Sequence, residues 1–259
     1  MKFDCIIMNP PYKRNLHLKI LAEAITHLKD KKSTCVNLSP STWASKYNIC
    51  QPKGKWRNKF NGKIDSLYFI PHDEANRLFG TGNSIEDLLI TTYKINGNFN
   101  ILKYGFNSEV EYSLFKKINI FSDDKNIMTV RQACNNGAYG TGNDIKNIVR
   151  KEFDVPIYQW HGGKTCKDAV VIKDNNRKAS LAFYFNSANE RQNFLNSLDT
   201  KFMNWYYMNF IVPGDGKIVN YMFRMADYSQ PWTDERFYKF FNITPDEQKI
   251  IEETMEKYK

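Results

Sequence analysis

The feature that most constrains the fold is the tetrapeptide Asn9-Pro10-Pro11-Tyr12, which directly follows an apolar run over residues 3–8. The nearly continuous apolar character of residues 2–8 predicts a short strand of a parallel sheet that is covered on both faces. Two consecutive prolines end such a strand, because the proline ring fixes φ and removes a backbone donor. We therefore expect the tetrapeptide at the carboxyl end of a strand, where open α/β sheets place their ligands.

Residues 1–97 alternate between strand and helix patterns, which predicts an α/β fold. Beyond the first strand, the expected elements are a helix at 15–30, a strand at 34–38, a strand at 64–70, a short helix at 73–79 and a strand at 88–95. This order gives only half of a full α/β sheet. The turn Asn96-Gly97-Asn98 is the expected end of this first domain.

The rest of the chain is less regular and predicts an irregular α+β region at 98–226, followed by a helical tail at 227–259. Short strands are expected at 126–131, 155–160, 168–173 and 181–185, and an aromatic-rich helix at 188–208. A last helix is expected to begin at Pro245, because Thr244 can cap it and acidic residues follow in its first turn.

The charge balance favours a polyanionic partner. The chain has 37 Lys and Arg against 28 Asp and Glu, a net charge of +9, and 15% aromatic residues. Basic and aromatic side chains together are typical of nucleic-acid binding, although the charge alone is also explained by solubility. Lys55, Trp56 and Arg57 form the densest basic run around an aromatic residue, and we expect them to contact DNA.

Cysteine usage and hydropathy exclude several classes of protein. The five cysteines are scattered and show no C-x-x-C pair, which argues against a disulfide framework or a zinc ribbon, and no metal-site spacing is present. We expect Cys5 and Cys35 to pack as buried apolar residues. No stretch approaches the ~18 apolar residues of a membrane span, and no signal peptide is recognisable, so we expect a cytoplasmic protein.

Two other groups of residues are weaker candidates. The segments Gly80-Thr81-Gly82-Asn83 and Gly140-Thr141-Gly142-Asn143 could bind phosphate, but the first follows an expected helix, so glycine turns explain them better. His161-Gly162-Gly163-Lys164 could touch a phosphate or a base, but a hairpin turn is the plainer explanation.

The tetrapeptide itself can hold an exocyclic amino group for methylation. The Asn9 side-chain oxygen and the Pro10 carbonyl can accept hydrogen bonds from the two amino hydrogens, which favours a more nucleophilic nitrogen. Tyr12 offers a flat face on which the base can stack. A base in a duplex must leave its stack to reach such a site. A simple turn after a strand remains the alternative explanation.

Residues 3–12 resemble the catalytic strand and loop of the adenine-N6 DNA methyltransferases of type II restriction-modification systems. Further segments are similar to the same family: 36–43, ending in Pro40-Ser41-Thr42-Trp43; 64–95, like the last strands of the methyltransferase sheet; and 227–235 with Tyr238. The resemblance implies a partial Rossmann-like sheet followed by a target-recognition domain, with S-adenosylmethionine as cofactor and double-stranded DNA as substrate. It carries Asn9, Pro10 and Tyr12 over as target-base residues, with Pro11 and Trp43 close to the substrate.

The chain departs from the family before the tetrapeptide. Members have a strand, a glycine-rich loop and an acidic residue there for the cofactor, and eight residues cannot supply them. We expect a methyltransferase that is incomplete alone and needs a cofactor-binding subunit or self-association. The alternatives are a catalytically inactive DNA-binding or specificity protein derived from such an enzyme, and an enzyme that methylates RNA or a protein amide.

Overall fold

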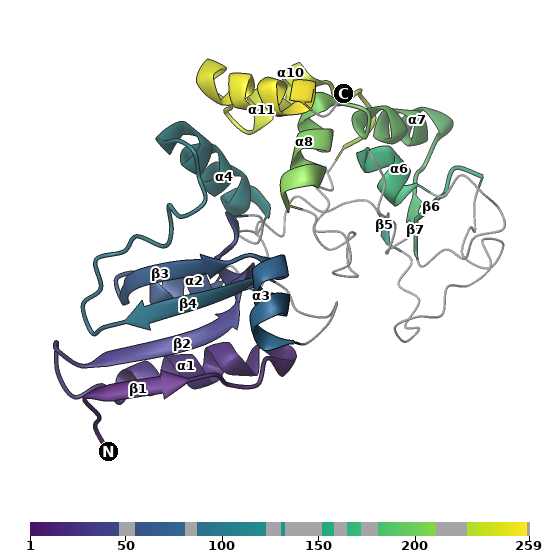
Figure 1. The fold of residues 1–259 in the computed structure, drawn as a ribbon. Coiled ribbons are helices and arrows are strands. Elements are labelled where there is room, and N and C mark those ends of the chain that lie inside the picture. The colour runs from purple at the N-terminus through teal and green to yellow at the C-terminus, as the bar shows by residue number, and fades with distance from the viewer. Residues whose placement is uncertain are drawn as a thin grey trace. The chain divides into compact units, whose positions relative to one another are not determined.

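The computed structural model describes residues 1–46, 55–80, 87–122, 131–132, 152–157, 165–171, 181–210 and 227–257 (Figure 1). The chain divides into two compact units, Met1–Glu109 and Val110–Lys259. The turn at residue 97 therefore lies within the first unit, and residues 227–257 belong to the second together with the helices before them. Each unit is a mixture of helices and strands.

The first unit follows the order expected from its sequence. Its elements are β1 (Cys5–Met8), η1 (Lys13–Asn15), α1 (Leu16–Thr26), β2 (Thr34–Pro40), η2 (Ser41–Ala44), α2 (Lys55–Phe60), β3 (Ile64–Ile70), α3 (His72–Phe79) and β4 (Leu88–Tyr93). Every strand and helix predicted over residues 1–97 is present within a few residues of its expected bounds. The short helix α2 and the 3₁₀ turns were not predicted.

The four strands form one mixed sheet in the order β1-β2-β4-β3. β1 is parallel to β2, whereas β4 is antiparallel to both β2 and β3. β4, the last of these strands in sequence, thus lies between two strands that run the other way. Pro40 at the end of β2 and Ile70 at the end of β3 both pair with Leu88 at the start of β4. The carboxyl ends of the three parallel strands therefore share one edge of the sheet.

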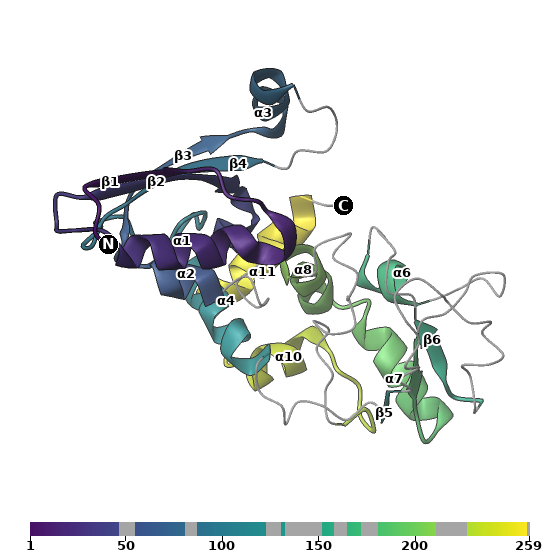
Figure 2. The ribbon, with the colours of Figure 1, turned by 90° about the horizontal axis from the view of Figure 1, so that it is seen from below.

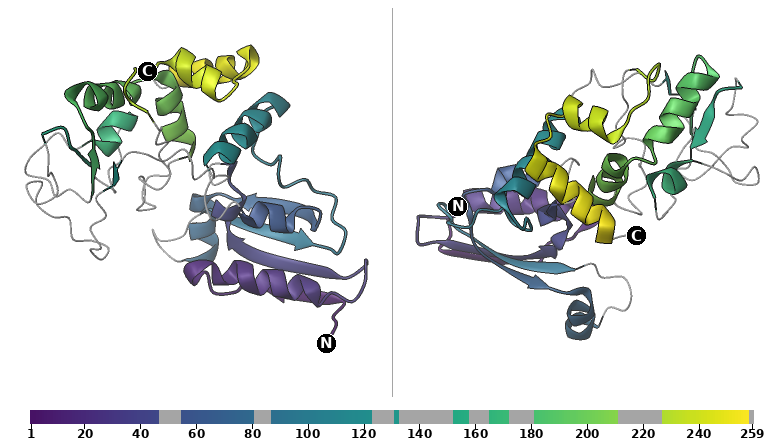
Figure 3. Two further views of the ribbon diagram at one scale, coloured as in Figure 1. Left: turned by 180° about the vertical axis from the view of Figure 1, so that it is seen from behind. Right: turned by 90° about the horizontal axis from the view of Figure 1, so that it is seen from above.

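The helices α1 and α2 cover one face of this sheet, as Figure 2 and the left panel of Figure 3 show. The core lies between them and consists of Leu18, Leu21, Ile25, Leu28, Cys35, Trp43, Ala44, Trp56, Phe60, Ile64, Leu89, Tyr93 and Ile101. The helical spacing of the apolar residues of α1 puts Leu18, Leu21 and Ile25 on this side. Cys35 is buried in this core, as expected, and burial raises the pKa of its thiol to about 11.

The opposite face is largely open in the described part of this unit. Ile7 in β1 is 80% exposed, Tyr68 in β3 58% and Ile90 in β4 36%. Tyr68 pairs with Ile90, and Ile90 pairs with Leu38, so an apolar row crosses three strands of this face. The prediction of a strand covered on both faces is therefore wrong for β1. Cys5 is likewise exposed rather than buried.

Gly97 closes the amino-terminal edge of this sheet. Its N–H donates to the Gly62 carbonyl, with an N–O distance of 2.9 Å, and Phe99 donates to Ile64 at 2.9 Å. A Cβ atom at position 97 would overlap the backbone of Ile64, so only glycine fits this close approach of two chain segments.

The second unit contains several helices and a small sheet. Its elements are α4 (Glu109–Ser122), β5 (Arg131–Gln132), β6 (Val155–Ile157), α6 (Cys166–Val170), β7 (Leu181–Tyr184), α7 (Ala188–Ser197), α8 (Lys201–Phe210), α10 (Asp234–Phe240) and α11 (Pro245–Lys257). The strands form an antiparallel sheet in the order β5-β7-β6. The strand predicted at 168–173 is wrong, because helix α6 occupies its first residues. Most of the strand predicted at 126–131 lies outside the described residues.

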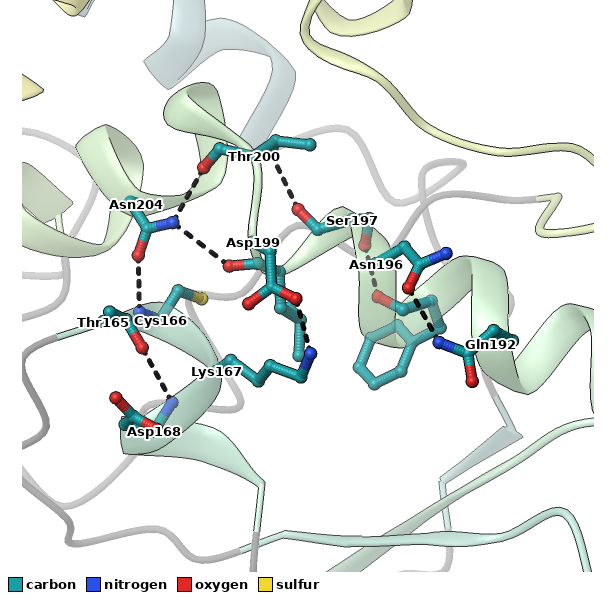
Figure 4. Close-up of polar contacts among 12 residues, drawn as sticks. Thr165, Cys166, Lys167, Asp168, Gln192, Asn196, Ser197, Asp199, Thr200 and Asn204 are labelled. Carbon is teal, nitrogen blue, oxygen red and sulfur yellow. Dashed lines mark hydrogen bonds and ion pairs between the residues drawn. The ribbon is translucent and has the colours of Figure 1, made fainter.

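The helix predicted at 188–208 is two helices, α7 and α8, separated by a turn that side chains stabilise (Figure 4). The Thr200 hydroxyl donates to the Ser197 carbonyl at 2.7 Å. The Asn204 amide donates to the carbonyls of Leu198 and Thr200 at 3.2 and 2.8 Å, and its oxygen accepts from the Cys166 N–H at 2.8 Å. Asn204 thus joins this turn to α6, whose Lys167 pairs with Asp199.

Aromatic side chains fill the interior of the second unit around α8. Phe202 stacks on Phe237 and Phe241, with ring centroids 4.8 and 5.1 Å apart. Trp205 lies edge-on to Phe115 of α4 at 5.4 Å. The interpretation of the aromatic helix as core rather than as a base-stacking surface is therefore confirmed for Phe202 and Trp205, which are fully or almost fully buried.

Candidate functional site

The Asn-Pro-Pro-Tyr loop (residues 9–12) leaves the sheet at the carboxyl end of β1 and leads into η1. Met8 pairs with Asn37 of β2, so Asn9 lies at the edge shared by the ends of the parallel strands. Asn9 and Pro11 are exposed, Pro10 is buried and Tyr12 is half-buried. The double proline follows the end of the strand, as expected, and Asn9 stands at the surface.

Tyr12 is held from two sides. Its side chain packs against an apolar cluster at the same edge of the sheet, formed by Leu38, Ile70, Ala75 and Leu88. Its ring also lies edge-on to the ring of the buried His17, with centroids 5.5 Å apart at an interplanar angle of 76°. The Tyr12 hydroxyl is protonated at neutral pH and can act as a donor, because the ordinary pKa of a tyrosine phenol is about 10 and burial raises the pKa of Tyr12 further.

The Tyr12 hydroxyl donates a hydrogen bond to Oδ1 of Asn9, with an O–O distance of 2.6 Å. This contact joins the first and last residues of the loop. An amide oxygen has two lone pairs, so Oδ1 of Asn9 can accept a second hydrogen bond while this one is kept. The acceptor that the chemistry of an amino group needs is therefore present on an exposed side chain.

Asp87, which no sequence pattern indicated, forms polar contacts at the same edge of the sheet. Oδ1 of Asp87 accepts from the N–H of His72 at 2.8 Å, and its carbonyl accepts from the N–H of Ser41 at 2.8 Å. Nε2 of His72 lies 2.9 Å from Nδ2 of Asn76. Asp87 thereby joins the start of α3 to the end of β2. Residue spacing gives no signal for this group, because β4 brings Asp87 back from a distant part of the chain.

Trp43 does not lie at this surface. Its side chain is fully buried, its indole N–H donates to the Ser39 hydroxyl at 3.2 Å, and its ring lies edge-on to Phe60 at 5.3 Å. The expectation that Trp43 contacts the substrate therefore needs correction, since its ring and its only donor are engaged in the core of the first unit. Trp43 was singled out because residues 36–43 resemble a methyltransferase segment, and such a resemblance does not separate buried from exposed side chains.

The basic run around Trp56 divides into buried and exposed members. Arg57 is buried, and its guanidinium donates to the carbonyls of Ala44, Ile101, Leu102 and Tyr104 at 2.6–2.9 Å. Trp56 is buried against Phe60. Neither side chain faces solvent, so both are corrected from DNA contacts to structural residues. Arg57 holds residues 101–104 against η2, and Trp56 packs in the core of the first unit. Lys55 and Lys59 stay exposed above the Trp56 ring, 5.6 and 5.3 Å from its centroid.

No known protein-family model matches this sequence, and no curated protein or solved structure shows a significant similarity to it.

The described residues do not form a site for S-adenosylmethionine. Gly80 ends helix α3 in a left-handed conformation, with φ of 60°, and its N–H donates to the Asn76 carbonyl. Gly62 and Gly97 meet at the other edge of the sheet from the Asn-Pro-Pro-Tyr loop. Gly105 follows the carbonyls that Arg57 binds. None of these described glycines follows the carboxyl end of a parallel strand, where a loop that cradles the cofactor would stand.

Other candidate groups fall partly or wholly outside the described residues. These are the Gly140-Thr141-Gly142-Asn143 segment, residues 81–83 of its counterpart and the His161-Gly162-Gly163-Lys164 turn. Within the described ranges, no three His, Cys, Asp or Glu side chains gather as a metal site would require. None of the helices described is both long enough and apolar enough to cross a membrane.

Proposed function

We propose that this chain is the base-binding and DNA-recognition part of a DNA adenine-N6 methyltransferase that acts together with a cofactor-binding partner. The observation that carries this proposal is the placement of the Asn-Pro-Pro-Tyr loop. It stands at the carboxyl end of a parallel strand, with Asn9 exposed and Tyr12 packed beside it. The strand ends of open α/β sheets are where such folds bind their substrates.

The arrangement of the sheet supports the same proposal. The resemblance assigns residues 64–95 to the last strands of a methyltransferase sheet, and these residues contain β3 and β4. β4 lies between β2 and β3 and is antiparallel to both strands. The ends of β1, β2 and β3 consequently share one edge with the Asn-Pro-Pro-Tyr loop. In our proposal, this sheet is part of a Rossmann-like sheet whose first strands lie elsewhere.

In this proposal, Asn9, Pro10 and Tyr12 each have a defined task. Oδ1 of Asn9 and the carbonyl of Pro10 accept the two hydrogens of the adenine amino group, and the face of Tyr12 stacks on the extruded base. The chain supplies position and two acceptors, and no group with a shifted pKa is required. Positioning of this kind accounts for a large part of the acceleration in reactions between two bound molecules.

A partner would supply the cofactor site. S-adenosylmethionine provides the methyl group in this family, and the described residues do not fit it. The open face of the first unit, with Ile7, Tyr68 and Ile90 exposed, is of the kind that proteins cover with another element or another chain. A separate subunit would supply the cofactor site, and either that subunit or a second copy of the chain would cover this face.

The net charge of +9 supports double-stranded DNA as the other partner. In the first unit, Lys55 and Lys59 are exposed and remain candidates for contacts with phosphate. Binding through such contacts should weaken steeply as salt rises. A flat salt dependence would contradict the DNA-binding part of the proposal.

A DNA-binding protein without catalysis is the second candidate. The lack of a cofactor site among the described residues favours it, since such a protein needs only the surface that recognises DNA. It differs from the first candidate in one property: methyl transfer stays absent whichever chain is added.

The decisive experiment measures transfer of a labelled methyl group from S-adenosylmethionine to duplex DNA. The chain is assayed alone and together with the product of a neighbouring reading frame that contains a strand and a glycine-rich loop. We expect no cofactor binding by the chain alone in calorimetry, and N6-methyladenine after nucleoside digestion only when both chains are present. Micromolar binding by the chain alone would contradict the missing cofactor site, and methyl groups found on cytosine or protein would contradict the adenine assignment.

A further inference from the structure

The hydroxyl of Tyr12 has a role separate from that of its ring. It donates to Oδ1 of Asn9 at 2.6 Å, and nothing in the stacking of a base on Tyr12 requires that bond. A phenylalanine ring would stack on a base equally well. The hydroxyl is therefore the part of the Asn-Pro-Pro-Tyr loop that the proposed function leaves unexplained.

The two residues differ in how firmly they are held. Tyr12 is half-buried, packed against the Leu38 and Ala75 cluster and fixed by the edge of His17. Asn9 is exposed, and the terminal torsion of an exposed asparagine is broad and roughly two-fold. Left to itself, the Asn9 amide would present either its oxygen or its NH2 group. The hydrogen bond from Tyr12 thus orients the Asn9 side chain.

The direction of the hydrogen bond selects one of the two amide orientations. Burial raises the pKa of the Tyr12 phenol, which keeps its proton available for donation. Oδ1 of Asn9 can accept this hydrogen bond and Nδ2 cannot, because an amide nitrogen is a donor only. An arriving amino group, itself a donor, then meets an oxygen with a lone pair to spare. If the Asn9 amide were rotated by half a turn, the arriving amino group would meet the NH2 group of Asn9 instead.

We propose that Tyr12 is a positioning residue that, through its hydroxyl, fixes the Asn9 amide with its oxygen toward an incoming amino group. This inference rests on the proposed function for the identity of the amino group. The orientation of Asn9 itself does not depend on that function. The two parts can therefore be tested separately.

The first test is spectroscopic and needs no substrate. The Asn9 side-chain NH2 signal of the full chain is assigned by its loss in Asn9→Asp, and its order parameter is measured in the wild type and in Tyr12→Phe. We expect a restrained amide in the wild type and an order parameter below about 0.6 in Tyr12→Phe, in the range of flexible groups. Equal order parameters in the two proteins would overturn the proposal, whether or not the chain binds DNA.

The second test uses a property of asparagine that aspartate lacks. Both terminal atoms of a carboxylate are oxygens, so Asn9→Asp presents an acceptor in either orientation. The probes are a short single strand with one adenine and the same strand with purine, which has no amino group, in place of adenine. The measured quantity is the dissociation constant of the purine strand divided by that of the adenine strand. This ratio separates the contribution of the amino group from general binding to the nucleic-acid backbone.

Tyr12→Phe should lower this ratio about twofold in the asparagine protein, because an amide that divides between two orientations presents its oxygen about half of the time. In the Asn9→Asp background, Tyr12→Phe should leave the ratio unchanged. An equal loss in both backgrounds would show that the hydroxyl acts on packing and would overturn the positioning role. A higher ratio in Tyr12→Phe would also overturn it, because the hydroxyl would then compete with the base. A wild-type ratio of one would contradict the adenine function alone, and the order parameters would still decide the orientation.

Discussion

Two of the segments that resemble adenine methyltransferases differ in how the structure uses their side chains. The Asn-Pro-Pro-Tyr loop leaves Asn9 at the surface, with its side chain hydrogen-bonded to Tyr12 of the same loop. The carboxyl-terminal segment at residues 227–238 uses several of its polar groups in contacts within its own unit. There, Asp234 accepts from the N–H groups of Lys201 and Phe202 at 3.2 and 2.7 Å and so caps helix α8.

Further hydrogen bonds hold the carboxyl-terminal segment along its length. Asn193 of α7 donates to the Tyr228 carbonyl at 2.8 Å, and the Trp232 indole donates to the Asp227 carbonyl at 2.6 Å. Its recognisable sequence is thus explained by helix capping and packing. A motif can contribute to stability or to chemistry, and substitution of its polar groups separates the two.

Replacement of Asn9 by alanine should give the largest effect and sharpens this contrast. In the reconstituted enzyme, methyl transfer should fall by on the order of a hundredfold or more, as when a preorganised hydrogen-bonding group is removed from an active site. The unfolding midpoint should not change, because Asn9 is exposed. Asn98→Ala, at an exposed asparagine of the same unit, is the control. Full transfer by Asn9→Ala would make the loop a structural turn.

Much of the first unit could be predicted because its elements follow local periodicity. The apolar run before Pro10 is a strand, and the spacing of Leu18, Leu21 and Ile25 is that of a helix. The strands β3 and β4 were also predicted close to their bounds. Local patterns did not predict that β4 runs antiparallel between β2 and β3, because strand order depends on contacts between distant residues.

The basic run shows why the candidate site was only partly predictable. Lys55, Trp56 and Arg57 are neighbours in sequence, yet one is exposed and two are buried. Arg57 is placed by carbonyls 44 to 47 residues away at positions 101, 102 and 104. Charge and aromatic content cannot reveal such partners. The break between α7 and α8 was missed for a similar reason, since Asn204 stabilises it together with Cys166 of another helix.

Asp234→Ala should show the reverse of the Asn9 result. The loss of a cap that accepts from two N–H groups should lower the free energy of unfolding by ~1–2 kcal/mol, measured by urea denaturation. Asp246→Ala is the control, because Asp246 also lies in the first turn of a helix but is exposed there. If Asp234→Ala were as stable as the wild type but had lost DNA binding, the carboxyl-terminal segment would serve function rather than stability.

Arg236→Lys tests the same segment with a smaller expected effect. The Arg236 guanidinium lies 4.0 Å from the centroid of the Trp232 ring and donates to the carbonyls of Gln230 and Pro231 at 2.9 and 3.0 Å. Lysine keeps the charge but lacks the planar fork, so we expect a loss of about 1 kcal/mol in thermal unfolding. Lys239→Arg, at an exposed site on the same helix, should leave the melting temperature unchanged.

Asp227 gives the smallest and most specific prediction, a dependence of stability on pH. Hydrogen bonds from Ser229, chiefly, and the charge of Arg236 lower the pKa of the Asp227 carboxyl. A carboxyl whose pKa is lower in the folded state stabilises the fold above its unfolded pKa, about 3.9, and this contribution disappears as the pH falls through the folded value. Asp227→Asn keeps an acceptor but removes the charge. The variant should therefore be less stable than the wild type at neutral pH and equal to it in strong acid. A stability difference that does not change with pH would show that the Asp227 charge contributes nothing and that the segment is held by its neutral contacts alone.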